Sequence, residues 1–163
     1  MMIKVLLLSL ALSSVQAFAP ASRAASTTLL QAETGEKKLA EMVSGERLEV
    51  MMQEWEQPLV VDAYATWCGP CLLMAPEFEA AAKELEGKVR FVKLDTDQEE
   101  SMAARLNIMG LPTLLFLGKY EGDENKEAAA VLKGRMEGAL RKDMIMSLCE
   151  HYFFDGPVPE GMA

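Results

Sequence analysis

Apolar residues recur along this chain at two spacings, one typical of strands and the other of helices. Strand-type runs bounded by polar or turn-forming residues occupy four stretches: 59–65, 89–94, 113–117 and 128–132. The first run is apolar on both faces, as a strand in the middle of a covered sheet requires, and Asp62 is its one acid. A shorter apolar patch within 33–44 is a candidate edge strand.

Helical spacing predicts four helices between these runs: 45–55, 69–86, 98–106 and 135–150. Pro76 should kink the second helix because proline removes one backbone hydrogen bond. The last helix carries an apolar stripe made of Met136, Leu140, Met144 and Leu148. The order (β)αβαβαββα predicts an α/β fold, with a central mixed β-sheet flanked by helices on both faces. Residues 119–127 should form a long hairpin connection.

Residues 1–32 have the composition of a targeting sequence rather than of a fold. Lys4 precedes an apolar run, 5–12, that is too short to span a bilayer as a mature helix. Val15-Gln16-Ala17 suits a signal peptidase, so we expect a signal peptide over 1–17 and no membrane association of the mature form. Residues 18–32 are hydroxylated and free of acids, as in a transit peptide.

This leader resembles the bipartite presequence of algae with secondary plastids, in which Phe18 would begin the transit peptide. The resemblance implies a destination in the plastid, the chloroplast stroma of such an alga. The alternative is an ordinary secretory signal, which would send the protein out of the cell or to the ER lumen.

The charge balance and the cysteine count restrict the function further. The formal net charge is −9, and Lys4 and Arg23 are the only charges before Glu33, so the remainder is more acidic still. An acidic surface repels phosphate backbones, which argues against a direct nucleic-acid partner. Two of the three cysteines share one C-x-x-C motif, which is not a disulfide framework. The pair indicates catalytic thiols, and the third cysteine, Cys149, lies outside the motif.

The stretch Trp67-Cys68-Gly69-Pro70-Cys71 follows the central strand and opens the second helix. C-x-x-C in a βα pattern is a redox signature. Two intervening residues at a helix start let the sulfurs approach bonding distance. The first sulfur then lies at the helix N-terminus, where free N–H groups and the dipole favour thiolate over thiol. We therefore expect Cys68 to be the more exposed nucleophile and Cys71 to resolve the mixed disulfide that it forms.

Two further features accompany this motif: Asp62 lies six positions before Cys68, and Gly110-Leu111-Pro112-Thr113 follows further on. Together with the motif, they resemble the thioredoxin family over roughly 44–150. The resemblance implies a thioredoxin fold in a domain at 33–150, followed by a tail at 151–163. It also implies a protein-disulfide reductase that acts on disulfide-containing target proteins and is recharged by a thioredoxin reductase. Because thiols do the chemistry, no cofactor and no metal are expected. The residues after Cys71 look most like the z-type thioredoxins of plastids.

The resemblance also implies roles for residues outside the motif. Asp62 would be a buried proton acceptor with a raised pKa, and Lys93 would moderate it; the alternatives are a solvent-facing strand-end acid and an ordinary surface lysine. Leu111-Pro112 would be a cis peptide beside which a target chain pairs as an added strand. The expected target groove consists of Trp67, Gly69, Pro70, Gly110, Leu111, Pro112 and Gly134. The other interpretation of Gly134 is a turn before the last helix.

Other functions remain open at this point. In the family that the motif resembles, Pro at the position of Pro70 implies a reductant, whereas His there is typical of oxidants and isomerases. The resemblance therefore disfavours a secretory-pathway oxidase or isomerase. A redox-linked assembly subunit of a plastid complex would use the apolar rim around Trp67 and Leu72. By count, three sulfurs and one nitrogen could bind zinc through Cys68, Cys71, Cys149 and His151. The redox role of the C-x-x-C pair argues against that site.

Overall fold

The computed structural model describes residues 39–122 and 129–161. The predicted leader at 1–32 and residues 123–127 of the predicted 119–127 connection lie outside the described residues. The secondary-structure elements follow one another in this order: β1 (Ala40–Met42), α1 (Gly45–Gln53), β2 (Leu59–Tyr64), α2 (Gly69–Glu84), β3 (Arg90–Asp95), α3 (Glu100–Arg105), β4 (Thr113–Lys119), β5 (Ala130–Glu137) and α4 (Lys142–Phe153).

The strands form one mixed sheet in the order β1-β3-β2-β4-β5. β3 pairs in parallel with both β1 and β2, while β4 runs antiparallel to β2 and β5. β2 therefore lies in the middle, and its residues from Leu59 to Ala63 are all buried. The continuous apolar run that predicted a central strand reflects this burial on both faces.

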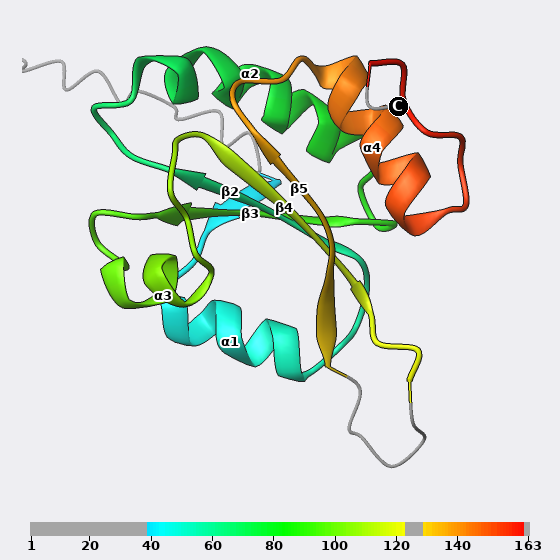
Figure 1. Cartoon of the computed structure of the whole chain (residues 1–163), viewed down its shortest axis with the longest axis horizontal. Coiled ribbons are helices and arrows are strands. Elements are labelled where there is room, and N and C mark those ends of the chain that lie inside the picture. The colour runs from blue at the N-terminus through cyan, green and yellow to red at the C-terminus, as the bar shows by residue number, and fades with distance from the viewer. Residues whose placement is uncertain (1–38, 123–128, 162–163) are drawn as a thin grey trace, which may run out of the picture. The chain divides into compact units, whose positions relative to one another are not determined.

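Helices cover both faces of the sheet: α2 and α4 lie on one side, α1 and α3 on the other (Figure 1). Alternate residues of β2 enter different cores, because successive side chains of a strand point to opposite faces. Val60 packs with residues of α2 and α4, whereas Val61 packs with residues of α1 and α3. Asp62, two positions after Val60, therefore faces the α2 side. This is the α/β architecture that the sequence predicted.

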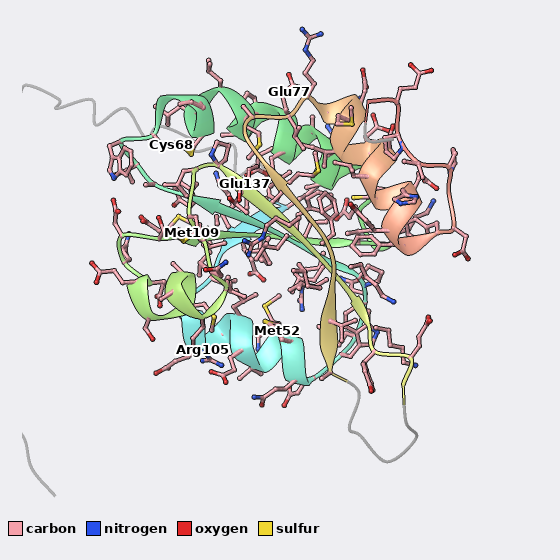
Figure 2. All side chains as sticks on the ribbon, in the orientation of Figure 1. Met52, Cys68, Glu77, Arg105, Met109 and Glu137 are labelled. Carbon is pink, nitrogen blue, oxygen red and sulfur yellow. A yellow bond between two sulfur atoms is a disulfide. The ribbon has the colours of Figure 1, made fainter. Side chains whose placement is uncertain are left out.

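α2 begins directly after Cys68 and contains Pro76 within its length. It is also joined to α4 by a side chain, since Glu77 accepts a hydrogen bond from the backbone N–H of Lys142 at 2.8 Å. Glu77 is labelled on α2 beside the start of α4 in Figure 2. Arg141, at the N-cap of α4, makes no side-chain capping bond of its own. Glu77 thus satisfies a free N–H group at this helix end, which fixes α2 against its neighbour.

The boundary between β5 and α4 differs from the prediction. The predicted helix at 135–150 was wrong at its start, because β5 continues to Glu137, which pairs with Thr113 of β4. Met136, placed on the helical stripe, instead pairs with Leu114. Residues 135–137 form a strand because their backbone groups find hydrogen-bond partners on β4. The helical spacing of their side chains is only a local preference, and this pairing overrides it. Gly138, at φ 93°, follows the strand.

The first residues of the predicted tail at 151–163 belong to a helix. α4 extends to Phe153, and Gly156 then donates its backbone N–H to the carbonyl of Glu150 at 2.9 Å. Asp155 adopts φ 55°, which turns the chain back along the helix. Further on, Pro159 is buried. In the part of the chain that the structure describes, every helix is too short or too polar to cross a membrane.

Candidate active site

The two cysteines of the motif are joined in a disulfide at the N-terminus of α2, with an S–S distance of 2.09 Å. Cys68 is the N-cap residue, and its Sγ accepts the backbone N–H of Cys71 at 3.2 Å. In the reduced protein the same N–H and the positive end of the helix dipole stabilise negative charge on Cys68 Sγ. The local sequence dictates this arrangement, since Pro70 at the helix start costs no hydrogen bond.

Cys68 was expected to be more exposed than Cys71, but the two side chains are equally buried. Their exposed fractions are 4% and 3%, so in the disulfide form both sulfurs are shielded. What separates them is position: Cys68 lines an open groove, and Cys71 does not. A disulfide that entered the groove would therefore meet Cys68 first.

The groove has a volume of about 430 Å³. It is lined by Trp67, Cys68, Gly69, Pro70, Thr96, Ala103, Ile108, Met109, Gly110 and Leu111. The sequence predicted the two ends of this set and also Pro112, which does not line the groove. It missed Thr96, Ala103 and Ile108, which no motif marks. Figure 2 shows Cys68 and Met109 at the same end of the sheet. The lining contains no charged side chain, so the groove suits an apolar peptide segment.

Polar contacts hold both walls of the groove. Trp67 is 71% exposed, yet its indole Nε1 donates to Asp97 at 2.8 Å, which fixes the orientation of the ring. Just before Ile108, a residue of the opposite wall, the guanidinium of Arg135 donates to the carbonyls of Leu106 and Asn107 at the end of α3. A cation at a helix C-terminus is favourable. Neither contact was predicted, because the partners are far apart in sequence.

The Leu111–Pro112 peptide bond is cis, as the resemblance implied. Thr113 donates its hydroxyl to the carbonyl of Gly110 at 2.7 Å, and Gly138 donates its backbone N–H to the carbonyl of Pro112 at 2.9 Å. These two bonds attach the loop to the start of β4 and to the end of β5. The glycine beside the cis peptide is therefore Gly138, which the sequence analysis did not single out.

Gly134, predicted to line the groove or to form a turn, does neither. It lies within β5, opposite Phe116 of β4, and is not among the groove residues. A Cβ atom at this position would lie 2.1 Å from Cζ of Tyr152. The absence of a side chain thus makes room for the ring that α4 places on the sheet, which is a packing role. Gly138 was missed because it fell inside the predicted helix at 135–150, whereas the structure places it directly after β5.

Asp62 is 1% exposed, so the solvent-facing interpretation is wrong. Neither carboxylate oxygen has a hydrogen-bond partner among the described residues. Burial raises the pKa of Asp62 to about 7, and the positive charge of Lys93 offsets part of that increase. Lys93 is the neighbour of Asp62 across β2 and β3. A buried acid with a pKa near neutrality can take up and return a proton at physiological pH.

A family model for thioredoxin matches residues 40–146, which span β1 to the first part of α4 and include both cysteines, Asp62 and the cis peptide. The chain belongs to the thioredoxin family. The fold and the disulfide at the start of α2 agree with that membership.

Individual relatives of this thioredoxin-family chain are plastid proteins. It is 43% identical over 115 residues to the chloroplastic thioredoxin-like protein CITRX of Oryza sativa subsp. indica, covering 71% of this chain and 52% of the relative. It is 33% identical to the chloroplastic M-type thioredoxin of Spinacia oleracea, covering 80% and 71%. A crystal structure of chloroplastic thioredoxin z superimposes with a TM-score of 0.57 at 40% identity, covering 69% of this chain and 93% of the other. The chain spans about half the length of the CITRX relative.

The third cysteine of this thioredoxin-family chain lies away from the site. Cys149 is fully buried in the core between α4 and the sheet, and burial, followed by the nearby charge of Glu150, raises its pKa to about 12. Such a thiol is neutral and inaccessible at physiological pH. Across residues 39–122 and 129–161, no cluster of His, Cys, Asp or Glu has an arrangement that could hold a metal ion.

Proposed function

We propose that this chain is a protein-disulfide reductase that transfers two electrons to disulfides in target proteins through Cys68 and Cys71. The observation that carries the proposal is the disulfide at the N-terminus of α2, with one sulfur on an apolar groove. A helix end that favours the thiolate and a groove that admits an apolar segment are what this chemistry needs.

The reaction begins with the reduced protein. The Cys68 thiolate attacks one sulfur of the target disulfide; a mixed disulfide forms, and the other target sulfur leaves as a thiolate. The Cys71 thiol then loses its proton and attacks Cys68 Sγ, which re-forms the Cys68–Cys71 bond and releases the second target thiolate. The target gains two electrons and two protons, one proton from Cys71 and the other from solvent, and the reductase is left oxidised, as in the structure described here.

Asp62 is the proposed acceptor of the Cys71 proton. It lies on the face of the sheet that α2 covers, and it is buried without a hydrogen-bond partner among the described residues. With a pKa raised to about 7, it is a far stronger base than an exposed aspartate and still ionises near neutral pH. It can return the proton as the target thiolate leaves.

Reduction of the Cys68–Cys71 disulfide requires a two-electron donor, for which we propose a thioredoxin reductase. We place the protein in the plastid, in the chloroplast stroma, because the relatives described above are chloroplastic and residues 1–32 have the composition of a leader. The finer proposal is a secondary plastid reached through a signal peptide at 1–17 and a transit peptide at 18–32. Fusion of residues 1–32 to a fluorescent protein tests it: fluorescence in the ER or the medium would contradict both proposals.

Insulin reduction with dithiothreitol as donor tests the reductase function. Cys68→Ser should abolish the activity, because it removes the attacking sulfur. Cys71→Ser should retain the first step and accumulate the mixed disulfide, detectable as a covalent adduct in non-reducing electrophoresis. Cys149→Ser is the matched control and should reduce insulin at the rate of the unmodified protein. Undiminished activity in Cys68→Ser would refute the assignment of roles.

A second function, participation in a plastid protein complex, is supported by one observation. Leu72 and Leu73 are 62% and 77% exposed on the first turns of α2, outside the groove. Exposed neighbouring leucines are typical of a protein contact. A Cys68→Ser/Cys71→Ser variant would still enter the complex, whereas Leu72→Ser/Leu73→Ser would not. If the cysteine variant also fails to enter it, the contact depends on disulfide exchange, and the structural role is wrong.

A further inference from the structure

Three side chains form a row across neighbouring strands, next to the cysteine pair. Met42 of β1 and Asp62 of β2 are both Cα partners of Lys93 of β3. Paired residues of neighbouring parallel strands point to the same face, so all three side chains lie on the side of the sheet that α2 covers. The only cation of the row thus stands beside the buried acid.

Tyr64 crosses this row. It lies two positions after Asp62 on β2, and its hydroxyl donates to Sδ of Met42 at 3.1 Å, two strands away. Between the β2 backbone and Met42, the Tyr64 ring lies under the ammonium group of Lys93, with Nζ 4.8 Å from the ring centroid. A cation within about 6 Å of an aromatic centroid is attracted to the ring face. The ring is therefore attached at both ends, by the backbone of β2 and by the sulfur on β1.

The ring competes with Asp62 for the lysine. Both oxygens of Asp62 lack a hydrogen-bond partner among the described residues, although the register neighbour of this acid carries an ammonium group. Lys93 has a long, flexible side chain and, without the ring, would gain more from the carboxylate, because a buried opposite charge is the stronger attraction. The observed position of Nζ over Tyr64 accounts for the missing ion pair.

We propose that Tyr64 is a positioning residue for the redox site: its ring, braced by Met42, holds the Lys93 ammonium group off the Asp62 carboxylate. Asp62 then stays available as a proton acceptor for Cys71 and is not neutralised in an ion pair. The inference about Lys93 concerns this chain's geometry alone, and only its consequence for proton transfer rests on the proposed reductase function.

Several other groups face this acid. Cys68 is the N-cap residue of α2, and Cys71 lies in its first turn. Asp95 lies two positions after Lys93 on β3, where it accepts hydrogen bonds from Asp97 N–H and Gln98 Nε2. Leu114 of β4 is uncharged. In the oxidised protein the two cysteines do not titrate, and the charge that acts on the pKa of Asp62 is that of Lys93.

The pKa of Asp62 in the oxidised protein tests the proposal. It is measured by ¹³C NMR of the side-chain carboxyl carbons between pH 4 and 9, with the Asp62 signal assigned by its loss in Asp62→Asn. Tyr64→Leu should lower this pKa by about 1, because Lys93 becomes free to pair with the carboxylate. Tyr64→Phe keeps the ring but loses its bond to Met42, so it should lower the pKa by less than Tyr64→Leu does. Lys93→Gln should raise it.

The double variant Tyr64→Leu/Lys93→Gln is decisive, because removal of the tyrosine should have no effect once the lysine is absent. Tyr152→Leu, a tyrosine of α4 that packs on Phe116, is the matched control and should not move the pKa. The proposal is overturned if Tyr64→Leu leaves the pKa where it was, if Tyr64→Phe lowers it as much, or if the effect persists without Lys93. Thermal unfolding of each variant shows whether it is folded.

The failure of this proposal differs from the failure of the proposed function. If the pKa of Asp62 responds as expected but Cys71→Ser captures no target, Tyr64 positions the lysine in a protein that is not a reductase. If insulin is reduced but the pKa is insensitive to Tyr64, the reductase function stands, and the role of Tyr64 is wrong.

Discussion

Replacement of Asp62 by asparagine should stabilise the oxidised protein at alkaline pH and not at acid pH. Burial raises the pKa of Asp62 from 3.8 to about 7, so the folded protein holds a proton that the unfolded chain has already lost. Stability therefore falls as pH rises from about 4 to about 7 and is constant above that range. At about 1.36 kcal/mol for each pKa unit, the difference amounts to about 4 kcal/mol. Asparagine cannot ionise, so the variant escapes this loss.

The assay is denaturant unfolding of both proteins in the oxidised state, at pH 4 and at pH 8. The difference in unfolding free energy between the variant and the unmodified protein should shift by about 4 kcal/mol in favour of Asp62→Asn between the two pH values. Any fixed cost of burying the amide is present at both pH values and cancels. Asp155→Asn, at an exposed position in the tail, is the control and should show no such shift. An equal difference at both pH values would refute the account of Asp62 as a buried, unpaired acid.

Three further predictions concern glycines and the buried thiol. Gly138→Ala should lower the free energy of unfolding by about 1 kcal/mol, because φ is 93° there. It should also slow insulin reduction, because Gly138 donates to the carbonyl of Pro112 in the cis peptide. Gly87→Ala, at φ 79° and away from the groove, should lower the unfolding free energy by the same amount without slowing the reaction. Gly134→Ala should lower the unfolding free energy by about 1–3 kcal/mol, since its Cβ would overlap Tyr152, while the folded variant keeps the rate of the unmodified protein. Iodoacetamide at pH 8 should leave Cys149 unmodified in the folded protein and label it after unfolding, as mass spectrometry can show; labelling of the folded protein would contradict its burial.

The sequence by itself determined the features that depend on neighbours in the chain. The apolar, β-branched run at 59–65 predicts β2 without any knowledge of its partners. Pro70, two residues after Cys68, suits the start of a helix. The cysteine spacing within one helical turn is enough to bring the sulfurs together, and the structure contains that disulfide. Burial of Asp62 also followed from its place within an apolar run. These features are local, and a sequence displays local features directly.

Only the tertiary structure decided the features that depend on partners far along the chain. Pairing with β4 turned residues 133–137 into a strand, moved the start of α4, and put Gly138 rather than Gly134 beside the cis peptide. The contact between Tyr64 and Met42 spans 22 positions, and it exists because β3 lies between their strands. Periodicity reports which face of an element is buried, but it does not say which side chain lies across from it. Strand order and register supply that information, and they arise from packing of the whole domain.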